Sequence, residues 1–147
     1  MHQRLIAGVL LLLLSGCSLH PYTKEELLSK GTASPEYCLT QERVLVEERV
    51  QRYLNKCYHP RVIEVATGGT IVQAMQLKVD SNAQRSEMLL WAPTIYGNQY
   101  YMNVIVSEKN LACKTTLTVV ASGWGFGRSS PKIVESANGD DPWCPMP

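Results

Sequence analysis

The side chains with the widest chemical repertoire in this chain are its five cysteines: Cys17, Cys38, Cys57, Cys113 and Cys144. A thiol can bind a metal, attack a substrate, join a disulfide or carry a lipid. No two of these cysteines have Cys-x-x-Cys spacing, and His59 is the only histidine in 37–147. Because zinc sites are built from such cysteine pairs and histidines, we predict no metal site.

Groups that could act as general acids or bases are equally sparse. A hydrolytic triad or a Cys–His dyad needs a histidine, and His59 follows a predicted helix, where histidine is typical of a dipole partner or a solvated cap. The acidic pairs Glu47–Glu48 and Asp140–Asp141 fall on a polar helix face and in the tail, as solvated charge does. Phosphate-loop, dinucleotide and zinc-protease motifs are absent from the sequence. We therefore predict no catalytic residues, no cofactor and no enzyme activity.

The first residues of the chain have the form of an export signal. Arg4 precedes the run Leu5–Leu14, which contains only apolar residues and one glycine, and small residues follow. A transmembrane helix needs about 20 apolar residues, so this run is too short to span a bilayer.

The cysteine that follows this run gives the signal a more specific meaning. Leu14-Ser15-Gly16-Cys17 resembles the lipobox of bacterial lipoproteins, a resemblance that covers the first segment only. It implies that the signal is removed before Cys17, whose sulfur and new amino group are acylated. Several acyl chains would hold the protein to a membrane far more firmly than one. In such lipoproteins aspartate after the cysteine favours the inner membrane, so Ser18 implies the outer membrane.

If Cys17 carries lipid, the four other cysteines form an even set in an oxidising compartment, which predicts two disulfides. A helix over 40–56 would hold Cys38 and Cys57 about 28 Å apart, and a disulfide needs Cα atoms within about 7 Å. That excludes 38–57 and leaves either 38–113 with 57–144 or 38–144 with 57–113. We favour the second pairing, because Cys38 and Cys144 flank the core and would join its ends.

The hydrophobic pattern changes its period at Pro60. Before it, apolar residues recur at spacings of three, four and seven, which predicts an amphipathic helix with one buried face. After it, short apolar or alternating segments separated by turn residues predict strands at 61–66, 70–80, 87–92, 100–107 and 113–121. A short helix over 131–138, stopped by Gly139, is also predicted. Short connections favour an antiparallel sheet of four to five strands, with the helix packed on it: a disulfide-stapled α+β fold.

These elements divide the chain into a signal peptide over 1–16, the lipidated cysteine and a tether over 17–36, and a single domain over 37–147. The tether is predicted from the prolines, glycine and serine of 18–36. Arg4 is the only charged residue of the signal, so the remainder carries 13 basic and 13 acidic residues. A neutral domain gives no electrostatic reason to expect nucleic acid as a partner.

Two aromatic stretches are candidates for partner binding. Trp124 and Phe126 alternate with glycines over 123–127, and they either form an exposed rim or turn inward to fill the core. Tyr96, Tyr100 and Tyr101 surround a predicted turn, where tyrosines suit protein or glycan contact but also half-buried packing in a sheet.

Together these features predict an outer-membrane-anchored lipoprotein whose small periplasmic or surface domain acts in binding or envelope assembly, with an envelope protein or glycan as partner. The alternative is an envelope inhibitor or exclusion lipoprotein directed at lysozyme, a phage or a plasmid. Known lysozyme inhibitors of this type resemble all-β barrels, which the predicted helix does not fit.

Overall fold

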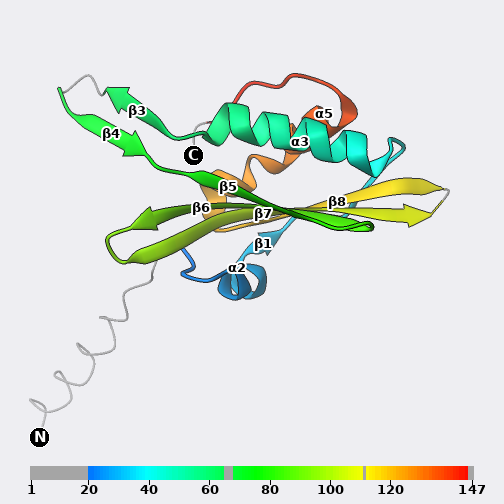
Figure 1. Ribbon diagram of the computed structural model, residues 1–147, viewed down its shortest axis with the longest axis horizontal. Coiled ribbons are helices and arrows are strands. Elements are labelled where there is room, and N and C mark those ends of the chain that lie inside the picture. The colour runs from blue at the N-terminus through cyan, green and yellow to red at the C-terminus, as the bar shows by residue number, and fades with distance from the viewer. Residues whose placement is uncertain (1–19, 65–67, 111, 146–147) are drawn as a thin grey trace, which may run out of the picture.

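The computed structural model describes residues 20–64, 68–110 and 112–145 (Figure 1). The predicted signal peptide and Cys17 lie outside these residues. The fold is α+β, as predicted, with an antiparallel sheet and two disulfides. None of the helices in the described ranges is long and apolar enough to cross a membrane.

The main sheet is larger than the sequence predicts. Its strands run in the order β1-β8-β7-β6-β5, and β2 also pairs with β8. The strand bounds are Thr32–Ala33 (β1), Tyr37–Leu39 (β2), Gln76–Ser81 (β5), Arg85–Thr94 (β6), Gly97–Asn110 (β7) and Cys113–Ala121 (β8). The predicted strand 87–92 is longer in the structure and continues through Pro93, which pairs with Asn98 near the turn. The added strands β1 and β2 are short and come from the predicted tether and its border with the domain.

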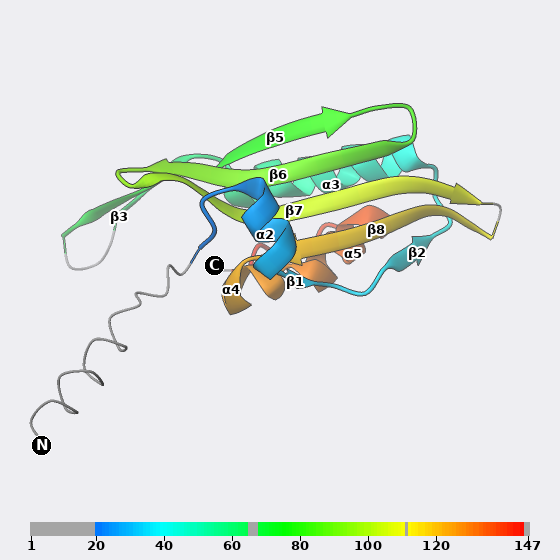
Figure 2. The ribbon, with the colours of Figure 1, turned by 90° about the horizontal axis from the view of Figure 1, so that it is seen from below.

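One face of the sheet is covered by α3 (Arg43–Tyr58), the predicted amphipathic helix (Figure 2). Its buried residues repeat at helical spacing and pack on Met88, Leu90 and the inward residues of β7 and β8. They are Val46, Val50, Tyr53, Leu54, Cys57 and Tyr58. The helix α5 (Ser130–Asn138) lies beside α3 and ends, as predicted, at Gly139, whose φ of 111° favours glycine.

The opposite face of the sheet is covered by α2 (Lys24–Lys30), in the segment predicted to be a tether. Thr23 caps this helix, and Leu27 is fully buried against Leu89 and Val120. Lys24 also forms an ion pair with Glu87 of β6. Residues 20–36 are therefore part of the folded domain, which corrects the predicted boundary at residue 37. Because Leu27 is the only buried residue of α2, the hydrophobic pattern of this segment gives little indication of a helix.

The disulfides join Cys38 to Cys113 and Cys57 to Cys144, each with Cα atoms 5.3 Å apart. The favoured pairing, 38–144 with 57–113, is thus wrong, and the alternative pairing is present. The reason is that β2 pairs with β8, so Cys38 lies next to the start of β8 at Cys113. The C-terminal tail meanwhile passes the end of α3, where Cys57 is buried.

The role of α2 in the fold can be tested with two adjacent leucines. Leu27→Ala should lower the free energy of unfolding by about 2–5 kcal/mol, because it removes a fully buried side chain. Leu28 is exposed on the same helix, so Leu28→Ala should change it by less than about 0.5 kcal/mol. Urea unfolding followed by circular dichroism measures both, and equal values for the two variants would show that α2 does not contribute to the domain.

Candidate functional site

The predicted Trp124–Phe126 rim is not a loop, since residues Gly123–Gly127 form the short helix α4 directly after β8. Phe126 is buried, with its ring centroid 4.9 Å from that of Tyr101 and 6.1 Å from that of Tyr58. The second of the two predicted roles, filling the core, therefore holds for Phe126. The side chain of Trp124 lies outside the part of the chain that the structure describes.

The three predicted tyrosines lie in three different surroundings, Tyr100 and Tyr101 on β7 and Tyr96 in the turn before it. The pairing of β6 with β7 shifts between Leu90 and Trp91, which leaves Tyr101 unpaired as an extra residue. Tyr100 packs near Leu27 on the α2 face and stacks on Trp91, whereas Tyr101 packs against Phe126 on the other face. Both are half-buried, so only Tyr96 remains fully available to a partner.

Tyr96 and Ile95 form the turn between β6 and β7, and they are the most exposed large apolar side chains described. Ile95 is 90% exposed and Tyr96 77% exposed. The turn is held by Thr94, whose hydroxyl donates to the Gly97 carbonyl (2.7 Å) and accepts from the Tyr96 amide (3.2 Å). Gly97 has a φ of 117°, a conformation that side chains disfavour. The exposed pair is thus presented on an ordered turn.

His20, which sequence reasoning did not select, attaches the start of the described chain to the domain. Its Nδ1 lies 3.0 Å from the Ser122 hydroxyl, and its ring meets Tyr101 edge-on with centroids 4.8 Å apart. Burial lowers the pKa of His20 below its ordinary value. Phe126 lies on the same side, 6.0 Å away. Two of the aromatic residues predicted to bind a partner, Tyr101 and Phe126, therefore pack around the start of the described chain.

A second exposed apolar surface lies on β3 (Arg61–Glu64) and β4 (Thr70–Gln73), together called the hairpin arm. Among the described strands these two pair only with each other. Val62 and Val72 stand directly opposite one another in the register, and each is about two-thirds exposed. Figure 1 shows the arm extending away from the main sheet, at the same end as the β6–β7 turn.

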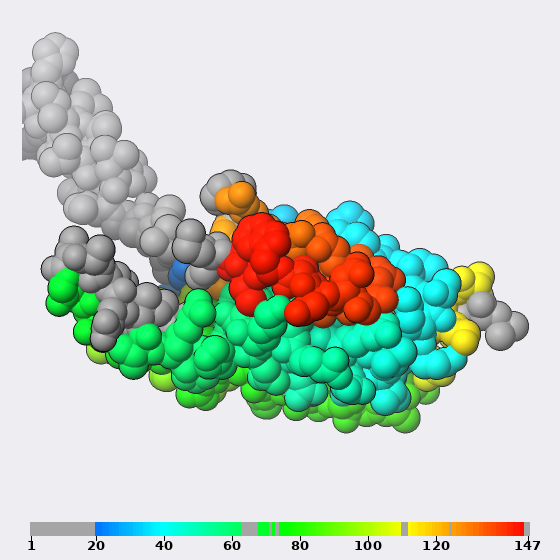
Figure 3. Space-filling view, turned by 90° about the horizontal axis from the view of Figure 1, so that it is seen from above, coloured from blue at the N-terminus to red at the C-terminus, as the bar shows by residue number. Residues whose placement is uncertain are grey.

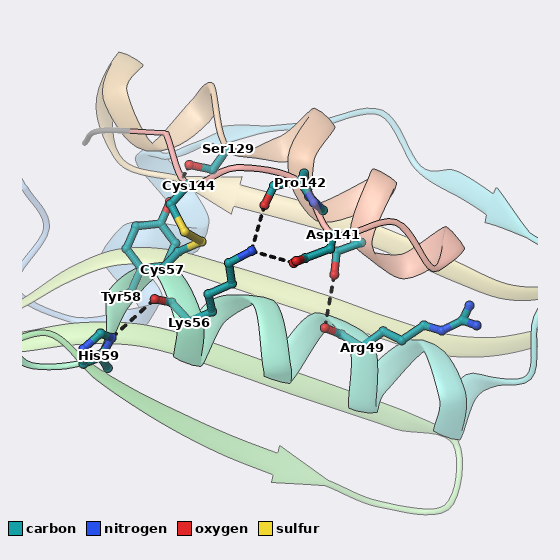
Figure 4. Close-up of a disulfide and its surroundings, with 10 residues drawn as sticks. Arg49, Lys56, Cys57, Tyr58, His59, Ser129, Asp141, Pro142 and Cys144 are labelled. Carbon is teal, nitrogen blue, oxygen red and sulfur yellow. Dashed lines mark hydrogen bonds and ion pairs between the residues drawn. A yellow bond between two sulfur atoms is a disulfide. The ribbon is translucent and has the colours of Figure 1, made fainter.

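A cavity of about 540 Å³ is lined by residues of α3 and by the end of α5 with the segment after it. Figure 3 shows this C-terminal segment alongside α3. Two of the basic residues that line the cavity, Arg49 and Lys56, hold the C-terminal segment in place. Arg49 donates to the Ala137 carbonyl at 3.2 Å. Lys56 donates to Asp141 (2.5 Å) and to the Pro142 carbonyl (3.3 Å) (Figure 4). The cavity therefore belongs to the packing that supports the Cys57–Cys144 disulfide.

The residues with acid–base or metal-binding potential do not converge. His59 is exposed at the end of α3, with its Nδ1 3.3 Å from the Lys56 carbonyl. Within the described ranges, no three His, Cys, Asp or Glu side chains are grouped so that they could hold a metal ion. The exposed apolar surfaces are therefore the better candidates for function.

Comparison with known proteins gives no match: no protein-family model fits the chain, and no curated protein or solved structure is significantly similar to it.

The attachment of His20 should depend on pH. A histidine whose pKa is lower in the folded state contributes stability that is complete above its unfolded pKa, about 6.5, and is lost as the pH falls through the folded value. The melting temperature of His20→Gln should therefore lie below that of the wild type at pH 7.5, and the difference should shrink towards pH 5. His59→Gln, a change at an exposed histidine, should follow the wild type, and a pH-independent difference for His20→Gln would contradict the prediction.

Proposed function

We propose that this protein is an outer-membrane lipoprotein, anchored through Cys17, that binds an envelope protein through the hairpin arm. The observation that carries the binding role is the arm itself: two strands with no other strand partner among those described, and an exposed valine pair across them. An isolated two-stranded hairpin is marginally stable in water. A bound partner would cover the exposed valine pair.

The anchor is supported by the lipobox and by two features of the fold. Two disulfides suit an exported protein, because they persist in oxidising compartments. His20, three residues after Cys17, is held by Ser122 and Tyr101, so the domain begins close to the proposed lipid. A lipoprotein built in this way would stand at the membrane without a long spacer.

The surface of the arm favours a protein as its partner. Val62 and Val72 form an exposed apolar pair, and full burial of one valine contributes about 1.5–3 kcal/mol. Each strand of the arm also has an edge that no described strand occupies, and such edges can accept a further strand from another protein. Apolar contact and main-chain pairing are modes of protein recognition, whereas glycan binding needs more polar groups.

The anchor predicts a covalent lipid on Cys17. Wild-type chain expressed in a Gram-negative bacterium should incorporate labelled palmitate and fractionate with the outer membrane. Cys17→Ser should lose the label and leave that fraction, because its signal would no longer resemble a lipobox. Mass spectrometry of the mature N-terminus locates the acyl groups, and an unmodified Cys17 would contradict the anchor.

The binding role predicts a contact at Val72. A photo-crosslinking amino acid at position 72 of the lipidated chain should give a discrete protein adduct in intact cells, and Val62→Glu should abolish it. Position 44 is the matched control, because Val44 and Val72 are each 67% exposed and Val44 lies on α3. Equal protein adducts from positions 72 and 44, or no adduct from position 72, would contradict the proposal that the hairpin arm binds a partner. Lysozyme protection by the purified protein would instead favour the inhibitor alternative.

A further inference from the structure

We infer that the β6–β7 turn, with Ile95 and Tyr96 at its tip, inserts into the surface of the lipid bilayer that holds the acyl chains of Cys17. The inference rests on the proposed anchor and adds to it a second, non-covalent membrane contact. It also gives Tyr96 a lipid surface as its partner, in place of a protein or glycan.

The first argument is one of reach. The Tyr100 amide donates a 2.9 Å hydrogen bond to the Pro21 carbonyl, which fixes the N-terminal segment to β7. Cys17 is four residues before Pro21, so it lies within about 14 Å of that point. Tyr96 is four residues before Tyr100, so at a rise of about 3.4 Å per residue it too lies within about 14 Å of that point. Cys17 and Tyr96 can therefore extend to similar distances from the hydrogen bond between Tyr100 and Pro21.

The second argument is one of direction. Figures 1 and 2 both show the β6–β7 turn at the end of the molecule where the described chain begins. His20 is held there by Ser122 and Tyr101, at the bulge in β7. A bilayer within reach of Cys17 therefore faces this end of the sheet.

The third argument is the chemistry of the β6–β7 turn itself. Residues 88–107, which contain the turn, include no Asp, Glu, Lys or Arg. The opposite end carries exposed ion pairs, Lys109 with Glu36 and Lys114 with Glu42. A branched aliphatic side chain and a tyrosine on an uncharged turn match the acyl and headgroup layers of a membrane, where tyrosine is enriched. The charged end suits water.

The test uses the full lipidated chain reconstituted in vesicles of phosphatidylethanolamine and phosphatidylglycerol. An environment-sensitive fluorescent amino acid is placed at position 95, or at the control position 83, which is exposed in the β5–β6 turn at the far end. Lipids spin-labelled near the headgroup should quench the probe at 95 at least twofold and leave the probe at 83 unchanged. Tyr96→Asp should reduce quenching at 95 towards the level at 83, and circular dichroism checks that this variant is folded.

The outcomes separate this inference from the anchor, because mass spectrometry reports acylation of Cys17 in the same sample. An acylated chain whose probe at 95 is quenched no more than that at 83 overturns the inference and leaves the anchor intact. An unacylated chain without quenching overturns both. In intact cells, a photo-crosslinker at 95 should form lipid adducts, and a discrete protein adduct in their place would overturn the inference.

Discussion

The structure depends on burial of both faces of the central strand β7. Met102, Val104 and Val106 face the α3 side, where they are fully buried, while Asn103 is buried on the α2 side. The α2 side is closed by polar contacts: Glu87 accepts from Asn103 at 3.2 Å and pairs with Lys24 of α2. Burial raises the pKa of Glu87, but the bonds from Lys24 and Asn103 outweigh it and hold that pKa below its ordinary value. The helix is therefore held by an ion pair as well as by Leu27.

This two-sided packing determines where an N-terminal anchor would lie. Because α2 is fixed on the sheet, the chain before it is fixed as well, down to His20 beside Ser122 and Tyr101. A flexible tether would let the domain take any orientation above a membrane. In an anchored protein, a short, docked segment would restrict that orientation and bring the loops at the same end towards the membrane.

The helices α3 and α5 could be predicted because the residues that define them lie close together in the sequence. The spacing of apolar residues predicts α3, and Gly139 predicts the end of α5. The remainder depends on contacts between residues far apart in the chain, which periodicity does not encode. The pairing of β2 with β8, which decides the disulfides, joins residues such as Cys38 and Thr116. Neighbouring residues of a strand always point to opposite faces, but the bulge in β7 decides that Tyr101, rather than Tyr100, faces α3.

The same reasoning explains why the exposed residues, rather than the aromatic cluster, are the better functional candidates. Phe126, Tyr101 and His20 contact one another, so the packing of the domain already accounts for their presence. No such account exists for Ile95, which is 90% exposed on a turn held by Thr94. An apolar side chain in that position contributes almost nothing to stability in water. Contact with a surface outside the domain would account for its presence, and the described chain begins at the same end as that turn.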